Sequence, residues 1–381
     1  MKELAVYIHI PFCKSKCHYC DFLSFSNKNE VIDKYFDYLN REIALYSEVV
    51  RDYSVKTIFL GGGTPSNVEP KYIFDILNSI HKKFNIDKVN EVTIEANPKT
   101  VNEDKLRIYK SIGINRISMG AQTLNDNLLK EIGRVHTVKD FYDSFNLIRS
   151  SGFENLNIDL MFNLPKQTLS DVVSTLEVVS GLGVEHISFY SLILEEGTRF
   201  YKRYSEGKLD LPDEELEREM YHRGIQILKS HGYKHYEISN FAKPSYECKH
   251  NLFYWKVKPY IGLGLGAHSN INGLRYWNEE NFENYFDSLE NGKLPINGSE
   301  KIDNAMEMAE YLILGLRLVD GVKLDDFYDR FHISIDSIYG SVLKKHEKSG
   351  LICNDGDRIR LTSKGLDLAN IVFVDLLPNQ D

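Results

Sequence analysis

The chain has 381 residues, of which 42% are hydrophobic, and this is enough apolar material for one large domain with a smaller companion. Acidic residues (55) outnumber basic residues (46), and the formal net charge is -9. No long basic tract is present, which disfavours nucleic acid as a partner and allows at most peripheral association with an anionic membrane.

The N-terminus reads MKELAVYIHIPFCKSKC. Its apolar stretch is too short for an export signal or a membrane-spanning helix, and His9 interrupts it. We therefore expect a cytoplasmic protein. In a reducing compartment, the odd number of cysteines (5) argues for metal ligands or free thiols rather than a disulfide framework.

From the start to about residue 195, short β-rich runs alternate with amphipathic stretches of helical length. The predicted strands are LAVYIHI, VKTIFLGGG, NEVTIEANP, RISMG, NLNIDLMFNLP and HISFYSLIL. The predicted helices between them lie at 30–50, 70–84, 102–112, 137–151 and 168–181. Six parallel strands in alternation with helices predict an α/β domain over 1–200, either a partial barrel or an open doubly wound sheet.

The rest of the chain divides into two regions. Residues 201–300 are aromatic-rich and without clear periodicity, and we expect them to cover the first domain. Residues 301–381 combine helices with a hairpin that turns at Asp355-Gly356 and a helix that starts near Thr362. This order predicts a small winged-helix-like domain within an α+β C-terminal region.

Three of the cysteines, Cys13, Cys17 and Cys20, follow the first predicted strand in a C-x3-C-x2-C pattern. Thiolates on one short loop can converge on a single inorganic centre. Structural zinc would need a fourth protein ligand, which His9 or His18 could supply. A 4Fe-4S cluster held by three thiolates would instead leave one iron open to an exogenous ligand.

The cysteine loop, with the aromatic Tyr19 before its last cysteine, resembles the radical S-adenosylmethionine (SAM) superfamily. The resemblance implies a partial (β/α)6 TIM barrel and a 4Fe-4S cluster whose ligands are Cys13, Cys17 and Cys20. It also implies that SAM chelates the open iron.

The segment GGGTP is similar to the glycine motif that holds the methionyl end of SAM, which points to Gly62, Gly63 and Thr64. Two carboxylates, Glu95 and Asp159, fall inside apolar strands, where an unpaired charge is costly to bury. Each therefore needs a partner. An internal ion pair, for instance with Arg116 or Arg134, is the alternative to a ligand.

Within the superfamily, the chain resembles the coproporphyrinogen-oxidase-like branch through YIHIPFC, GGGTP, MGAQT, NIDLMFNLPKQT and GLGAHS, which occur in the family order. The resemblance places Tyr7 beside the cluster. It assigns contacts with SAM to Glu95, Gln122, Arg134, Asp159, Ser191 and His268. One departure is Asn163, which stands where the family commonly has glycine.

Two functions compete within this branch. The oxidase group, which decarboxylates coproporphyrinogen III, has CxxxCxxCxC at the cluster and an N-terminal extension, whereas this chain has Phe22 at the fourth cysteine position. The HemW-type heme chaperones are marked by CDF and by HNxxYW, and this chain reads His250-Asn251-Leu252-Phe253-Tyr254-Trp255. The resemblance therefore implies a heme chaperone, with the oxidase as the alternative.

Histidine is a natural axial ligand of heme iron, and we expect His250 to bind heme. A core role, in an aromatic strand with a hydrogen-bonded histidine, is the alternative. The resemblance implies delivery of heme to acceptors such as respiratory enzymes, and a homodimer. Whether SAM is cleaved stays open.

A third interpretation is a zinc protein whose winged helix binds nucleic acid. The basic residues of that region are Lys344, Lys345, Lys348, Arg358, Arg360 and Lys364. Because Glu347, Asp355 and Asp357 are interspersed among them, the sequence disfavours this interpretation.

Overall fold

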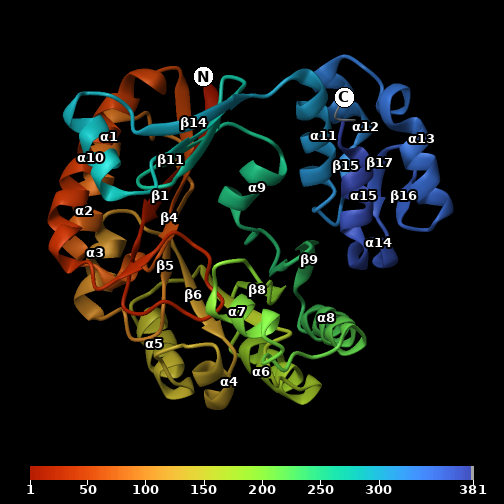
Figure 1. The fold of residues 1–381 in the computed structure, drawn as a ribbon, viewed down its shortest axis with the longest axis horizontal. Helices are drawn as coiled ribbons and strands as arrows, with labels where there is room; N and C mark the ends of the chain where they lie inside the picture. Colours follow the sequence, from red (N-terminus) through yellow and green to blue (C-terminus); the bar gives the residue numbers. More distant parts are fainter. Residues whose placement is uncertain (379–381) are drawn as a thin grey trace.

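Six strands from the first half of the chain lie side by side in chain order and in parallel, as predicted (Figure 1). They are β1 (Lys2–Ile10), β4 (Tyr53–Gly62), β5 (Glu91–Ala96), β6 (Arg116–Gln122), β7 (Leu156–Phe162) and β8 (His186–Ser191). This computed structural model describes residues 1–378. Parallel strands of this kind direct their carboxyl ends to one edge, where ligands bind in such folds.

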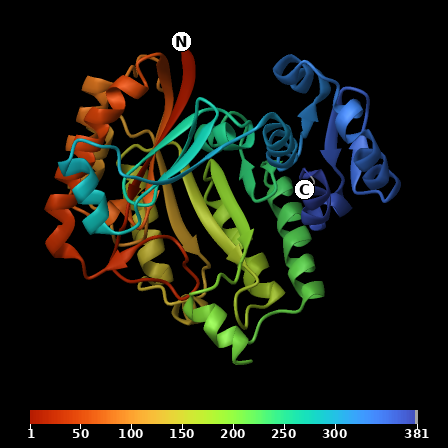
Figure 2. The same ribbon diagram turned by 45° about the horizontal axis from the view of Figure 1, so that its top comes forward.

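The helices that connect these strands pack on the outer side of the curved sheet (Figures 1 and 2). They are α1 (Ile32–Val49), α2 (Pro70–Lys83), α3 (Glu103–Ser111), α4 (Asp126–Glu131), α5 (Val138–Ser150) and α6 (Leu169–Gly181). The five predicted helices begin and end within two residues of the observed ones. Capping boxes at Thr137 and Thr168 explain the sharp starts of α5 and α6.

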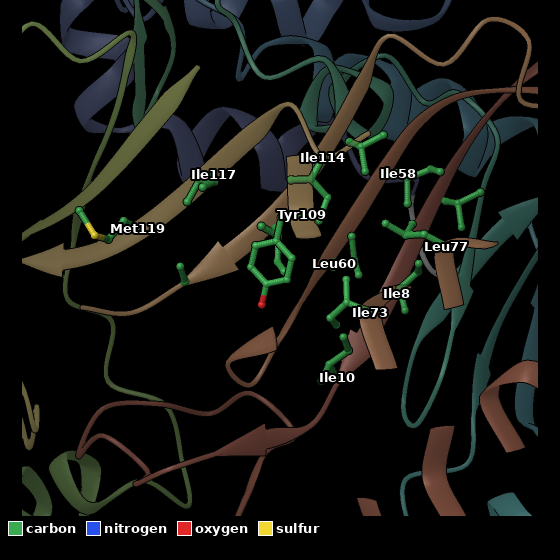
Figure 3. Close-up of a cluster of buried hydrophobic side chains, with 14 of the residues drawn as sticks. Ile8, Ile10, Ile58, Leu60, Ile73, Leu77, Tyr109, Ile114, Ile117 and Met119 are labelled. Carbon is green, nitrogen blue, oxygen red and sulfur yellow. The ribbon is translucent and has the colours of Figure 1, made fainter. Parts of the chain in front are cut away.

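One hydrophobic core lies between this sheet and its helices. Figure 3 shows Ile58 and Leu60 of β4 beside Ile73 and Leu77 of α2, and all four side chains are fully buried. Each such side chain stabilises the fold by about 1.5–3 kcal/mol through burial. The carboxyl ends of the strands are therefore held by a rigid scaffold.

Residues 201–300 differ from the prediction, because they extend the same sheet at both edges instead of covering it irregularly. At one edge, β11 (Tyr260–Leu263) pairs in parallel with β1 and continues into the antiparallel strands β12 (His268–Ile271), β13 (Leu274–Asn278) and β14 (Ile296–Lys301). At the other edge lie β10 (Asn240–Ala242) and β9 (Lys234–Glu237). An open six-stranded sheet leaves unpaired backbone groups on its edge strands, and these additions satisfy them.

Four helices accompany these strands: α7 (Arg199–Ser205), α8 (Glu214–Ser230), α9 (Lys249–Trp255) and α10 (Phe282–Glu290). The segment HNLFYW lies in α9, so the alternative of an aromatic strand is wrong in its secondary structure, although His250 is buried and hydrogen-bonded as that alternative expected. A tertiary contact decides this, because the carboxylate of Glu91 accepts hydrogen bonds from the backbone nitrogens of Lys249 and His250, both at 2.9 Å. Those nitrogens belong to the first turn of the helix, where a negative charge is favourable.

The C-terminal region stands to one side of the barrel and has its own core (Figures 1 and 2). Its elements are α11 (Asn304–Gly315), β15 (Val322–Lys323), α12 (Leu324–Phe331), α13 (Ile335–Lys348), β16 (Ile352–Asn354), β17 (Arg358–Leu361), α14 (Ser363–Asp367) and α15 (Ala369–Leu376). The predicted hairpin is confirmed, with Gly356 at a φ of 87°. Thr362 caps the following helix. This is the helix and strand order of a winged helix.

Within residues 1–378, none of the helices combines the length and the apolar character that crossing a lipid bilayer requires.

Candidate cluster and SAM site

The loop with the three cysteines leaves the end of β1 and runs between two short parallel strands, β2 (Phe12–Cys13) and β3 (Phe25–Ser26). His18 ties the loop to the end of α4, because its Nδ1 lies 3.0 Å from the carbonyl oxygen of Glu131 and its backbone nitrogen donates to Ile132 at 3.0 Å. A side chain at Gly133 would collide with the ring of His18. The loop is therefore fixed from outside itself.

His9 ties down the other end of the loop. Its Nε2 lies 2.8 Å from the carbonyl oxygen of Leu23, and its Nδ1 lies 3.0 Å from the hydroxyl of Tyr7. Both histidines that the zinc interpretation proposed as a fourth ligand thus hold the backbone of the loop. Within residues 1–378, no three His, Cys, Asp or Glu side chains come close enough together to hold a single metal ion such as zinc, a criterion that does not apply to a cluster of several irons.

A cavity of ≈ 490 Å³ opens beside the loop, at the carboxyl ends of the parallel strands. Most of the residues predicted from the sequence lie on its wall: Cys13, Cys17, Tyr19, Cys20, Gly62, Gly63, Thr64, Glu95, Gln122, Arg134 and Asp159. These residues come from the first loop, from the ends of β4 to β7 and, for Arg134, from the segment between α4 and α5. The topology therefore brings together residues that are far apart in the sequence.

Three predicted residues lie away from this wall, each because its side chain is held elsewhere. The hydroxyl of Tyr7 forms a hydrogen bond with His9, and the hydroxyl of Ser191 donates a hydrogen bond to Glu217. His268 is exposed on β12, where its ring stacks on Trp277 with centroids 5.8 Å apart. The structure therefore gives none of the three a contact with the cavity.

The two carboxylates on the wall lack cationic partners. No Lys, Arg or His of residues 1–378 lies within ion-pair distance of Glu95 or Asp159, although the charge of Arg116 acts on both at longer range and lowers their pKa values; the expected alternative of a direct pair with Arg116 or Arg134 is therefore not observed. Burial, reinforced by the charge of Asp159, raises the pKa of Glu95 to about 8. Burial also raises the pKa of Asp159. A cationic ligand in the cavity would stabilise the ionised form of both carboxyl groups and so lower both pKa values.

Arg134 connects the cavity to the cysteine loop. Its Nη2 donates to Oδ1 of Asn97 at 2.7 Å, and its Nη1 lies 3.6 Å from Sγ of Cys17. Asn97 in turn donates to Oγ1 of Thr64 at 3.0 Å, and that oxygen lies 3.4 Å from Sγ of Cys13. The Nε of Arg134 is buried without a hydrogen-bond partner in the described chain.

The sequence pattern places Asn97, like Glu95, at the end of the third predicted strand, but it assigns Asn97 no ligand. It lies two residues after Glu95, just past the end of β5, so the alternation of a strand places both side chains on one face. Ser118 of β6 and Tyr190 of β8 also line the cavity without having been predicted. They lie within runs that read as buried strands, so periodicity could not separate them from core residues.

The thiols are suited to metal and not to free reactivity. Burial raises the pKa of Cys13, and it raises the pKa of Cys20 to about 11. Such thiols keep their protons at neutral pH until a metal displaces them. Three thiols, two unpaired carboxylates and an arginine with an unused donor therefore fit an iron-sulfur cluster with a zwitterionic ligand beside it.

A model of the radical SAM superfamily matches residues 7–179, and a model of the HemN C-terminal domain matches residues 302–368. The heme chaperone HemW of Bacillus subtilis (strain 168) is 40% identical over 372 residues, which span 97% of this chain and 98% of that protein. The chain belongs to the HemW family. Membership in the radical SAM superfamily brings a 4Fe-4S cluster and SAM as its cofactors.

Two other relatives in the HemW family support the assignment. The heme chaperone HemW of Lactococcus lactis subsp. lactis (strain IL1403) is 38% identical over 372 residues, 98% of this chain and 97% of that protein. The heme chaperone HemW of Escherichia coli (strain K12) is 38% identical over 272 residues, 71% of each chain.

A solved structure confirms the predicted fold class. Coproporphyrinogen III oxidase (HemN) from Escherichia coli, a radical SAM enzyme, superposes with a TM-score of 0.86 at 22% identity, and the match covers 98% of this chain and 90% of that one. At this identity the match establishes the barrel and the C-terminal domain as a shared fold.

Proposed function

We propose that this protein is a heme chaperone, which binds heme and passes it to heme-requiring acceptors such as respiratory enzymes. The observation that carries this proposal is near full-length identity of 40% to a relative named heme chaperone HemW, together with the HNLFYW segment. In this proposal the cluster and SAM are resident cofactors and heme is the cargo.

The residues on the cavity wall divide into two proposed roles. Cys13, Cys17 and Cys20 hold the cluster and leave one iron open. Glu95 and Asp159 complement the positive charge of SAM, and Gly62, Gly63 and Thr64 line the place of its methionyl end. The support for this division is that all of these residues line one cavity.

His250 has two candidate roles, iron ligand or anchor of α9. Its side chain is 1% exposed, its Nδ1 lies 2.9 Å from Oγ1 of Thr57, and its Nε2 lies 2.9 Å from the hydroxyl of Tyr254. Burial, with a smaller effect of the charge of Arg116, lowers the pKa of His250 to about 3. Coordination of iron would require the ring to give up one of these hydrogen bonds, so this geometry supports the anchor.

Titration with hemin tests the proposal. We expect the anaerobically reconstituted protein to shift the Soret band saturably, and to transfer the heme to the apo form of a b-type cytochrome. A protein that carries its cluster but shows no saturable Soret change would contradict the proposal. The variant His250→Ala separates the two roles, because loss of an iron ligand changes the type of Soret spectrum, whereas loss of an anchor lowers affinity and stability.

An oxygen-independent coproporphyrinogen III oxidase is the second candidate function. The superposition on HemN favours it at the level of fold. It predicts release of CO2 from coproporphyrinogen III under anaerobic reducing conditions with SAM. Absence of CO2 from protein with an intact cluster would remove this candidate and leave the chaperone.

Two further expectations belong to the proposal. We expect a cytoplasmic protein, because its five cysteines are all free thiols in the structure. We also expect a homodimer that depends on the cluster, which size-exclusion chromatography before and after removal of iron would test.

A further inference from the structure

A second cavity, of ≈ 710 Å³, lies where α9 faces the C-terminal domain, and we call it the interdomain cleft. One wall consists of α9 and β9, and the other consists of α11, β15, α12 and β17. Figures 1 and 2 show α9 between the barrel and this domain. The volume is in the range of small-molecule sites.

The HNLFYW segment connects the two cavities. His250 and Tyr254 anchor α9 to the barrel through the hydrogen bonds with Thr57 and with each other. Asn251 lines the cluster cavity. Leu252 and Trp255 line the interdomain cleft. A helix of this length therefore presents one face to each cavity and a third face to the barrel.

The walls of the cleft offer apolar surface for a flat ligand. Leu252 and Trp255 of α9 lie opposite Tyr311, Leu318 and Val322 of the C-terminal domain. The indole nitrogen of Trp255 is buried, and no described residue accepts a hydrogen bond from it. The guanidinium of Arg317 lies 4.5 Å from the centroid of this ring, so one face of the indole is already covered.

Charged side chains surround this apolar surface. Lys234 pairs with Asp320 at 2.8 Å, and Arg330 pairs with Glu307 at 2.7 Å. Lys256, which directly follows α9, and Lys323 of the facing wall form no ion pair with any residue of 1–378. The acidic lining residues without an ion pair are Glu247, Asp326 and Asp329. The unpaired acidic residues outnumber the unpaired lysines by one, so Lys256 and Lys323 mark the two positions of this set that favour an anion.

We propose that the interdomain cleft binds heme, with its macrocycle between α9 and the C-terminal domain and its two propionates at Lys256 and Lys323. The ligand class follows from the combination of two facing apolar walls with two unpaired cations. This inference rests on the proposed function, and it adds the place of binding. In it, His250 is a positioning residue that holds one wall of the cleft.

The test is hemin titration of the full-length, cluster-loaded protein and of the double variant Lys256→Glu/Lys323→Glu. We expect the variant to bind hemin about tenfold more weakly, because two attractions become repulsions. The matched control is Lys82→Glu/Lys83→Glu, which reverses two exposed charges at the end of α2, and it should bind as the wild type does. Equal iron content and circular dichroism establish that the variants are folded.

Hemin dimethyl ester gives a second measurement that needs no variant. The wild-type protein should bind the ester more weakly than hemin, whereas the double variant, whose glutamates repel propionates, should bind the ester at least as tightly as hemin. If the wild type binds no hemin, the proposed function fails. If it binds hemin while the double variant binds equally well, or if it binds the ester as tightly as hemin, only the assignment to the cleft is overturned.

Discussion

The cluster cavity takes its wall from strand ends of a single sheet, whereas the interdomain cleft takes its wall from two domains with separate cores. Thiols and carboxylates are enclosed in the cavity, and lysines with long flexible side chains surround the cleft. A cofactor that stays bound benefits from a rigid enclosure. A cargo that must leave benefits from walls that can separate, because motion between domains is the ordinary expectation for such an interface.

The largest expected effect is on the cavity side. Cys17→Ser removes one of three cluster ligands, and we expect nearly all iron and acid-labile sulfide to be lost after anaerobic reconstitution. Cys353→Ser, in β16 of the C-terminal domain, is the matched control and should keep the cluster. A full complement of iron in the Cys17 variant would show that this thiol is not a ligand.

The next largest effect concerns the contact between Glu237 and Arg317, which joins the barrel to the C-terminal region beside the cleft. We call this contact the junction. Glu237 of β9 is fully buried and accepts two hydrogen bonds from Arg317, at 3.1 Å and 2.8 Å. Glu237→Gln leaves the guanidinium without its counter-ion, and we expect the free energy of unfolding to fall by about 3 kcal/mol.

Denaturant unfolding measures this loss, while the iron content should not change. The exposed pair of Arg275 and Glu300 supplies the control, because Glu300→Gln should cost less than about 1 kcal/mol. An equal loss in the two variants would mean that the junction is no stronger than a surface contact.

A smaller effect depends on pH. The pKa of Glu95 is raised from 4.5 to about 8 in the folded protein, so the unfolded chain loses this proton first as the pH rises. The contribution of Glu95 to the free energy of unfolding is therefore fully present below pH 4.5 and is lost as the pH rises to about 8. For this group we expect a loss of about 2 kcal/mol between pH 5 and pH 7.

Glu95→Gln should remove this part of the pH dependence and weaken the binding of SAM. Glu42, whose pKa burial raises to about 7, contributes to the fall in both proteins, so the difference between the two curves isolates Glu95. Parallel curves for the variant and the wild type would mean that Glu95 is already ionised in the folded state.

The smallest effect is expected at the mouth of the cavity. Phe22 stands where the oxidase group has a fourth cysteine, and its side chain is 62% exposed. Phe22→Ala should change the free energy of unfolding by no more than about 0.5 kcal/mol and leave the iron content unchanged. A large loss in thermal denaturation would reveal a contact that this geometry does not contain.

Much of the barrel could be predicted because its signals are local. Apolar periodicity placed the five helices, and the β-rich apolar runs placed the six strands. The cysteine spacing indicated the cluster loop, the carboxylates inside strands indicated Glu95 and Asp159, and the family resemblance supplied most of the remaining wall. Ser191 and His268 are different, since the motif that suggested them does not reveal which neighbour holds each side chain.

The sequence by itself determined the order of strands and helices and the residues that meet at the strand ends, because a parallel sheet brings those ends together whatever the details of packing. Only the tertiary structure decided the role of HNLFYW. Its helical conformation depends on Glu91, and the orientation of His250 depends on Thr57, which lie 159 and 193 residues away. Contacts at such separations leave no periodic pattern, and so the two faces of α9 became visible only in the folded chain.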